Sequence, residues 1–122
     1  MIIAIPVDKK AADSAVCASF GRAPYFMIFD TNTKESVFLD NAAAAGPGGA
    51  GIKAAQTVID HKAEAVLAPR VGGNAANVLE AAGVKIYQTT AGSAAENLEA
   101  FAAGDLALLQ DVHPGFRSGG GR

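Results

Sequence analysis

Side chains that commonly hold metals or carry redox chemistry are scarce in this sequence. Its 122 residues include one cysteine, Cys17, two histidines and no tryptophan. A single cysteine excludes an internal disulfide and a CxxC-type zinc or redox motif, and it is typical of a protein of the reducing cytoplasm. His61 and His113 form neither an HExxH nor an H-x3-H pattern. The sequence therefore contains no recognised metal-binding motif.

The sequence also lacks a large excess of positive or negative charge, and it lacks long apolar runs. Ten lysines and arginines stand against twelve aspartates and glutamates, which gives a net charge of −2. This balance provides no general positive field for a phosphate backbone, so no nucleic-acid partner is expected. No apolar run approaches the roughly 18 residues of a membrane span, and the N-terminus lacks the basic region of a signal peptide. We expect neither a membrane partner nor a cleaved leader.

What the sequence does contain is typical of one folded domain. Half of its residues are hydrophobic, 27 alanines among them, and 18% are charged. We expect a single domain over residues 1–112 with a thin, closely packed core. Residues 113–122 hold a proline, four glycines and no periodicity, so we expect a flexible C-terminal tail with no chemical role.

Hydrophobic patterning predicts an α/β fold. Short apolar or β-branched runs predict strands at 2–6, 25–30, 35–40, 65–68 and 84–88. Helices alternate with the later strands, which implies right-handed crossovers and parallel pairing there. We expect a mixed five-stranded sheet with the first strand in its centre, only the second strand antiparallel, and helices on both faces.

Apolar residues at helical spacing predict the three helices. The first two are indicated by Ile52, Ala55, Val58 and Ile59, and by Ala75, Val78, Leu79 and Ala82 before a C-terminal Gly83. The third begins with Ser93 and Glu96 in capping-box spacing and ends at Gly104. Its inward face is expected to carry Leu98, Phe101 and Ala102.

Most glycines fall in the segments that follow the four parallel strands, at 7–24, 41–51, 69–73 and 89–92. Open α/β sheets bind ligands at this edge. Segment 41–51 includes Gly48, Gly49 and Gly51 and leads into a helix with Lys53 on its first turn, where backbone N–H groups could hold an anion. The alternative is a surface loop whose glycines only permit turns.

Two further corners of this edge carry candidate binding residues. Arg70 stands just before Gly72, Gly73 and Asn74, so a positive charge lies beside another helix start. The alternative there is a solvated arginine with Asn74 as a helix cap.

The loop before the second strand supplies the other corner. It holds Cys17, Ser19, Gly21 and Arg22, and we expect the thiol and the arginine to face the same crevice. A small buried apolar cysteine is the alternative interpretation.

Two stretches of the sequence, FGRAPYF at 20–26 and residues 71–106, closely resemble the dinitrogenase iron-molybdenum cofactor biosynthesis family. The resemblance extends over almost the whole chain up to Leu106. It implies a ribonuclease-H-like, three-layer α/β/α fold and the binding of a metal-sulfide cluster without catalysis. The family comprises cofactor carriers, the C-terminal domain of a cofactor-assembly enzyme, and the orange protein of sulfate-reducing bacteria, which carries a molybdenum-copper sulfide cluster.

This sequence lacks histidines that many family members have before FGRAPYF and in the glycine-rich loop or tail. Many members have histidine before FGRAPYF, where this chain has Ser19, and Cys17 remains as the one candidate metal ligand. An iron-sulfur cluster needs several thiolates, whereas a preformed thiometallate anion needs only N–H donors, cations and an apolar wall. The resemblance therefore favours noncovalent carriage of a molybdenum-copper sulfide cluster, or else of an iron-molybdenum cofactor precursor, with a cluster-donor or acceptor protein as partner.

Two other functions stay open from the sequence. The chain could be a protein-interaction module that keeps the fold and has lost metal binding, which the missing histidines favour. A hydrolase of the ribonuclease-H-like fold would need acids clustered around magnesium, and Asp8, Asp30 and Asp40 form no convincing cluster.

Overall fold

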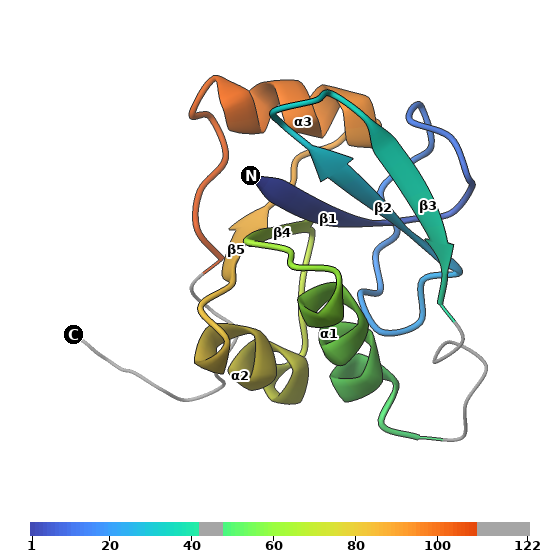
Figure 1. Ribbon diagram of the computed structural model, residues 1–122, viewed down its shortest axis with the longest axis vertical. Coiled ribbons are helices and arrows are strands. Elements are labelled where there is room, and N and C mark those ends of the chain that lie inside the picture. Colours follow the sequence, from blue (N-terminus) through green and yellow to red (C-terminus); the bar gives the residue numbers. More distant parts are fainter. Residues whose placement is uncertain (42–47, 110–122) are drawn as a thin grey trace.

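The computed structural model describes residues 1–41 and 48–109. The predicted tail at 113–122, the end of the predicted domain and most of segment 41–51 lie outside these residues. In chain order the elements are β1 (Ile2–Val7), β2 (Tyr25–Asp30), β3 (Ser36–Asp40), α1 (Ala50–Asp60), β4 (Ala65–Ala68), α2 (Gly73–Ala81), β5 (Lys85–Gln88) and α3 (Ala94–Ala102) (Figure 1).

The strands form one mixed sheet in the order β3-β2-β1-β4-β5. β2 pairs antiparallel with both β1 and β3, whereas β4 runs parallel to β1 and β5. β1, β3, β4 and β5 therefore end at one edge of the sheet, and β2 ends at the other. The predicted topology, with a central first strand, is confirmed.

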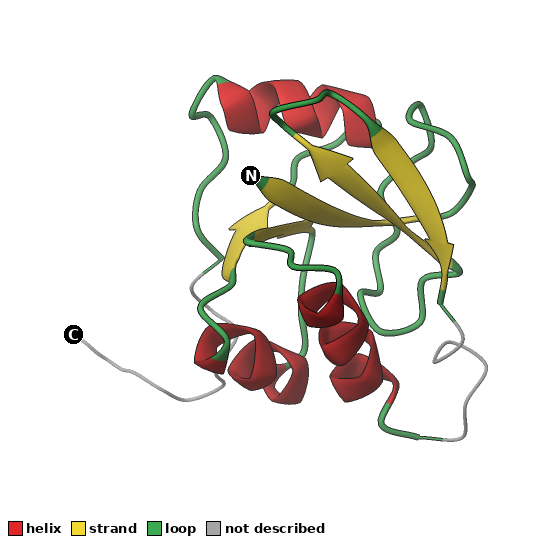
Figure 2. Cartoon of the chain, viewed as in Figure 1, coloured by secondary structure: helices red, strands yellow, loops and turns green. Residues whose placement is uncertain are grey.

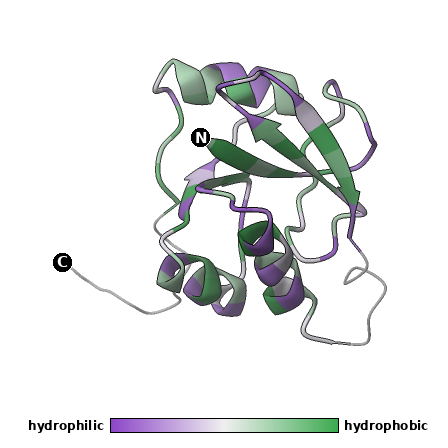
Figure 3. Cartoon of the chain, in the orientation of Figure 1, coloured by the Kyte–Doolittle hydropathy of each residue, from purple (hydrophilic) through white to green (hydrophobic). Residues whose placement is uncertain are grey.

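Helices cover both faces of the sheet, as the ribbon shows (Figures 1 and 2). α1 and α2 pack on one face, where Phe26, Val66 and Leu79 belong to one apolar cluster. α3 packs on the other, where Leu98 and Phe101 lie against a second cluster that includes Ile5 and Leu67. Side chains of alternate residues in β1, β2 and β4 enter opposite clusters, so these three strands are apolar along most of their length (Figure 3). The three-layer α/β/α architecture is confirmed.

The helix ends follow the predicted signals. Ser93 Oγ accepts from Glu96 N at 3.1 Å, and Glu96 Oε1 accepts from Ser93 N at 2.8 Å, which completes the capping box. Gly83 and Gly104 follow the C-caps of α2 and α3 with φ of 81° and 79°, the left-handed conformation that favours glycine.

Three side chains expected on inward faces are instead exposed: Ile52, Ala82 and Ala102. α1 begins at Ala50, so its buried face runs through Ala54 and Val58 and leaves Ile52 41% exposed. Ala82 is the C-cap of α2 and Ala102 is the last residue of α3, where neither helix packs on the sheet any longer. The described helices include none that is long and apolar enough to cross a membrane. The expected cytoplasmic location stays a prediction.

Candidate functional site

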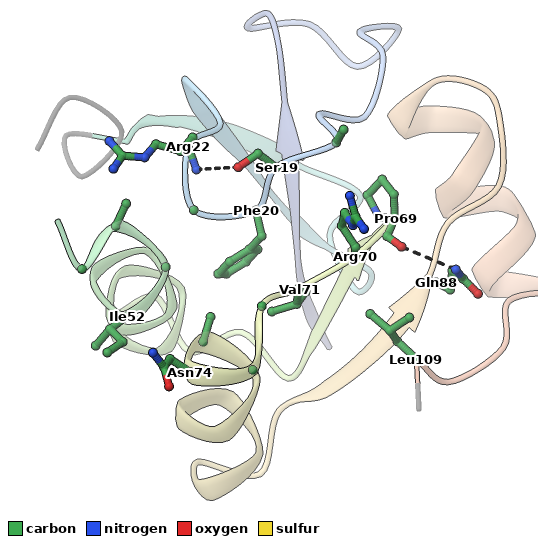
Figure 4. Close-up of a pocket in the computed structure, with 18 residues that line it drawn as sticks. Ser19, Phe20, Arg22, Ile52, Pro69, Arg70, Val71, Asn74, Gln88 and Leu109 are labelled. Carbon is green, nitrogen blue, oxygen red and sulfur yellow. Dashed lines mark hydrogen bonds between the residues drawn. The ribbon is translucent and has the colours of Figure 1, made fainter. Parts of the chain in front are cut away.

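An open cavity of about 1030 Å³ lies at the edge of the sheet where the parallel strands end (Figure 4). Its walls come from the segment after β1, the first turn of α1, the turn after β4 with the start of α2, and the end of β5. β1 and β4 are neighbours, but the chain continues from β1 to β2 on one side and from β4 towards β5 on the other. Such a switch point is the usual ligand-binding crevice of an open α/β sheet.

The start of α2 opens into this cavity without a cap. Its N-cap residue, Gly72, has no side chain to accept a hydrogen bond, and the first bond of the helix runs from Ala76 N to Gly72 O at 2.9 Å. The N–H groups of residues 73–75 therefore have no hydrogen-bond partner in the described part of the chain. Asn74 is the second residue of the helix and lines the cavity, so the alternative that it caps α2 is wrong.

The start of α1 is equally uncapped and faces the same cavity. Gly49, its N-cap residue, accepts from Lys53 N at 3.0 Å, and residues 50–52 keep N–H groups without a partner among residues 1–41 and 48–109. The two helix starts lie close together, because a Cβ atom on Gly51 would lie 3.3 Å from Ala75 Cβ. Two positive helix ends thus converge on one volume.

The N–H groups at the start of α3, unlike those of α1 and α2, have hydrogen-bond partners among the described residues. Ala94 N donates to Ser14 O and Ala95 N donates to Ala12 O, both at 2.9 Å, and Glu96 N donates to Ser93 Oγ. All N–H groups of the first turn of α3 are therefore satisfied by the chain itself. Only the two helices at the cavity leave theirs available to a ligand.

Two arginines are among the residues that line the cavity (Figure 4). Arg70 leaves the turn after β4, and its exposed guanidinium forms no hydrogen bond or ion pair with another described residue. Arg22 comes from the segment before β2, where its N–H donates to Ser19 Oγ at 3.1 Å. Within residues 1–41 and 48–109, no aspartate or glutamate lines the cavity. The local charge is therefore positive, although the chain as a whole carries −2.

The segment that carries Arg22 lies directly on the first turn of α1. A Cβ atom on Gly21 would lie 2.8 Å from Gly51 N and 2.9 Å from Gly51 Cα, so only glycine fits there. Asn41, at the end of β3, holds this segment by donating from Nδ2 to Gly21 O at 3.0 Å and to Ala23 O at 2.9 Å. These contacts fix one wall of the cavity.

Apolar side chains complete the wall, and sequence reasoning did not identify them. They are Phe20, Ile52, Pro69, Val71 and Leu109. Phe20 packs on Phe26 with ring centroids 5.1 Å apart, which anchors the wall in the core. The position of Phe20 within FGRAPYF could have identified it as a lining residue, whereas the hydrophobic periodicity gave no indication that Leu109 lines the cavity.

The structure brings most of the predicted binding residues to this cavity. Those that line it are Ser19, Gly21, Arg22, Gly49, Gly51, Arg70, Gly72, Gly73 and Asn74. Cys17, Gly48 and Lys53 do not line it. Residues 89–92, after β5, do not line it either, although Gln88 does, with Nε2 3.5 Å from Pro69 O.

Cys17 was expected to face the crevice, and this expectation is wrong. Val16 bridges to Val7, and Cys17 N donates to Pro6 O at 2.8 Å, so the chain here folds back along β1 and leaves the thiol half-buried beside Asp8. Burial raises the pKa of the thiol; the hydrogen bond to the Ser19 backbone opposes this effect, and the Asp8 carboxylate adds to it. Ligation by Cys17 stays a prediction that this geometry does not favour.

No three histidine, cysteine or acidic side chains lie close enough to hold a metal ion within residues 1–41 and 48–109. The acids considered for a hydrolase are separated by the sheet itself. Asp30 ends β2 opposite Ile2 at one edge of the sheet, whereas Asp40 ends β3 and Asp8 follows β1 at the other edge. The cavity can therefore hold an anion through N–H groups and arginines, against an apolar wall.

Comparison with known proteins agrees with this fold. The model of the family described as "Dinitrogenase iron-molybdenum cofactor" matches residues 1–104. The apo form of the orange protein from Desulfovibrio gigas is 31% identical, with a TM-score of 0.85 over 88% of this chain and 92% of that chain. An NMR structure of a proposed NifB protein from Thermotoga is 34% identical, with a TM-score of 0.80 over 98% of both chains.

A proposed dinitrogenase from Methanocaldococcus jannaschii, 18% identical, shares the fold with a TM-score of 0.69 over 89% of this chain and 94% of that chain. A search of curated proteins found no match. The family match covers every element of the structure, from β1 to the end of α3. The chain belongs to the dinitrogenase iron-molybdenum cofactor family.

Proposed function

We propose that this protein binds an anionic metal-sulfide cluster in the cavity and carries it without chemical turnover. One observation carries the proposal: two uncapped helix starts, α1 and α2, open into one cavity that Arg22 and Arg70 line, and none of the described residues that line it is acidic. Each helix end offers N–H groups and about half a positive charge. An anion that accepts hydrogen bonds from the N–H groups of both helix starts would be held in the cavity and would also stabilise the two helices.

The apolar wall favours sulfide over oxygen as the surface of the anion. Phe20, Val71 and Ile52 offer no hydrogen bonds to an oxyanion, which would lose hydration against them. Sulfide ligands are softer and more weakly hydrated, so they lose less on contact with carbon. A sulfide cluster is therefore a better complement to a cavity with one cationic side and one apolar side.

The lining residues also favour a cluster that arrives complete. In the part of the chain that the structure describes, they include no cysteine, histidine, aspartate or glutamate, the side chains that usually bind iron, copper or molybdenum. In a preformed cluster the metals are already coordinated by their own sulfides. We therefore favour a molybdenum-copper sulfide cluster as cargo, followed by an iron-molybdenum cofactor precursor.

A carrier of this kind receives its cargo from one protein and passes it to another. The cavity is open at the end of the sheet, so a cluster held there stays accessible to a donor or acceptor protein. Noncovalent contacts permit release without breaking a metal-protein bond. The described lining groups supply binding and orientation, and none of them is an acid or base suited to catalysis of bond cleavage.

Titration with tetrathiomolybdate, alone and with copper(I), tests the proposal. Under anaerobic conditions we expect a coloured complex with a fixed ratio of molybdenum to protein after gel filtration. Arg70→Ala should weaken binding roughly tenfold, since a charge-assisted hydrogen bond contributes about 1.5–3 kcal/mol. Lys85→Ala removes the same charge from the start of β5 and should leave binding unchanged. No co-eluting metal would contradict carriage and favour an interaction module.

A further inference from the structure

Two buried asparagines each hold a loop at the edge of the sheet where the parallel strands end. Asn97 is 1% exposed; its Nδ2 donates to Thr90 O and Ser93 O, and its Oδ1 accepts from Thr90 N at 2.9 Å. Asn41 is 6% exposed, and its Nδ2 donates to Gly21 O and Ala23 O. Each amide replaces backbone partners that an irregular segment cannot find by itself.

The two loops differ in what they contribute to the cavity. The loop held by Asn97, residues 89–93, does not line the cavity. The segment held by Asn41 supplies Phe20, Gly21 and Arg22 to it. Asn41 N also donates to Pro24 O at 3.0 Å, so three hydrogen bonds join the end of β3 to residues 21–24.

The side-chain amide of Asn41 donates hydrogen bonds but accepts none from the described residues. Both N–H bonds of its amide are used, but Oδ1 is buried and has no hydrogen-bond partner among the described residues. An unpartnered buried acceptor lowers stability, whereas every polar atom of the Asn97 amide is satisfied. The side chain at position 41 therefore serves as a double donor to the segment that carries Arg22.

We propose that Asn41 is a positioning residue of the anion cavity and acts through Arg22. This inference rests on the proposed function. Asn41 presses Gly21 onto the first turn of α1, where a Cβ atom would lie 2.8 Å from Gly51 N. Arg22, the next residue of this segment, is thereby held among the residues that line the cavity. Without the amide, the guanidinium loses its fixed place at the cavity while the rest of the fold persists.

A double-mutant cycle with tetrathiomolybdate as the ligand tests this inference. Asn41→Leu keeps the branched shape and the number of heavy atoms and removes both donors, so it should weaken binding about as much as Arg22→Ala, roughly fivefold to tenfold. The double variant should bind no more weakly than the weaker-binding single variant, because both substitutions remove the same interaction between Arg22 and the ligand. Asn41→Leu combined with Arg70→Ala should instead show the product of the two effects.

Asn97→Leu is the matched control. It removes an equally buried amide with three hydrogen bonds and should lower the unfolding temperature while leaving the affinity of the folded protein unchanged. If Asn41→Leu does not fold, Asn41→Ser, which can still donate to one carbonyl, should show the same non-additivity with Arg22→Ala.

Two outcomes would overturn the positioning role alone. In one, folded Asn41→Leu binds tetrathiomolybdate with wild-type affinity. In the other, the loss of affinity in the double variant equals the product of the losses in Asn41→Leu and Arg22→Ala. Failure of the wild-type protein to bind tetrathiomolybdate would overturn the proposed function and the positioning role together. The wild-type titration therefore separates the two failures.

Discussion

Gly21 lies against Gly51 so closely that a Cβ atom on Gly21 would come 2.8 Å from Gly51 N. The two residues come from the segment before β2 and from the first turn of α1, and both line the cavity. Gly51 in turn lies beside Ala75 of α2. One close backbone contact thus sets the spacing of the elements that supply N–H groups and charge.

Gly21→Ala should separate these elements. The added methyl group meets backbone atoms that cannot rotate away, so we expect a loss of roughly 1–3 kcal/mol in the free energy of unfolding. Binding of tetrathiomolybdate should weaken as well, because Arg22 moves with the segment. Chemical unfolding and titration measure the two effects.

Gly48→Ala is the control for this change, since its Cβ atom would meet no atom within 4 Å. It should leave both stability and affinity close to the wild-type values. Equal behaviour of the two alanine variants would show that the contact between Gly21 and Gly51 does not set the spacing of the site.

Gly72→Asp should stabilise the protein and weaken its binding. Gly72 has φ −63° and ψ 156°, an extended conformation suited to an N-cap, and a side chain there meets open space. A carboxylate that caps α2 should add roughly 0.5–1 kcal/mol to the free energy of unfolding. The same carboxylate occupies the free N–H groups and repels an anion, so affinity should fall at least about tenfold.

Gly72→Ser separates capping from charge. Its hydroxyl can cap the helix without repelling the ligand, so we expect a similar gain in stability and a smaller loss of affinity. Thermal unfolding and titration of both variants provide the comparison. An aspartate variant that binds like the wild type would refute a role for the α2 N-terminus.

Molybdate and tetrathiomolybdate have the same charge and tetrahedral shape, so their affinities isolate the contribution of the apolar wall. We expect the sulfide anion to bind more tightly. Ile52 lines the cavity but is 41% exposed, so Ile52→Gln changes the wall with little effect on folding. This variant should reduce the preference for sulfide roughly threefold. An equal affinity of the wild type for both anions would contradict selection by the wall.

The Cys17 thiol should make stability depend on pH in the alkaline range. Its pKa is raised in the folded protein, first by burial and then by Asp8, against an ordinary value near 8.5. Well below that value the thiol is protonated in both states and has no effect. Above it the unfolded chain loses the proton first, so the free energy of unfolding falls as pH rises towards the folded pKa.

Cys17→Ser removes this titration. Its free energy of unfolding should therefore decline less between pH 8 and pH 10 than that of the wild type, as urea unfolding at each pH measures. Identical slopes would mean that the thiol is not perturbed. The variant should also bind tetrathiomolybdate like the wild type, whereas a loss of binding would restore Cys17 as a metal ligand.

The topology and the site edge could be predicted because they follow from patterns that repeat along the chain. Alternation of apolar runs gave the strands, and the parallel order brought Arg70, Gly72 and segment 18–22 to one edge. The capping box of α3 could be predicted because both partners, Ser93 and Glu96, lie within one turn.

What could not be predicted depends on how irregular segments fold back on the sheet. Cys17 is turned away from the cavity by the bridge between Val7 and Val16, which no periodicity indicates. The roles of Asn41 and Gly21 depend on contacts with residues 18 to 30 positions away in the sequence. Lys53 does not line the cavity because α1 begins at Ala50, so Lys53 is the fourth residue of the helix and lies beyond the first turn.

Backbone amide shifts on addition of tetrathiomolybdate test the central claim most directly. Molybdenum is diamagnetic in this anion, so each amide can be followed in a two-dimensional NMR spectrum of the labelled protein. We predict the largest shifts at residues 50–52 and 73–75, whose N–H groups have no partner in the described structure, and none at residues 94–96, whose N–H groups are capped. Shifts spread evenly over the three helix starts, or confined to residues around Cys17, would contradict the account.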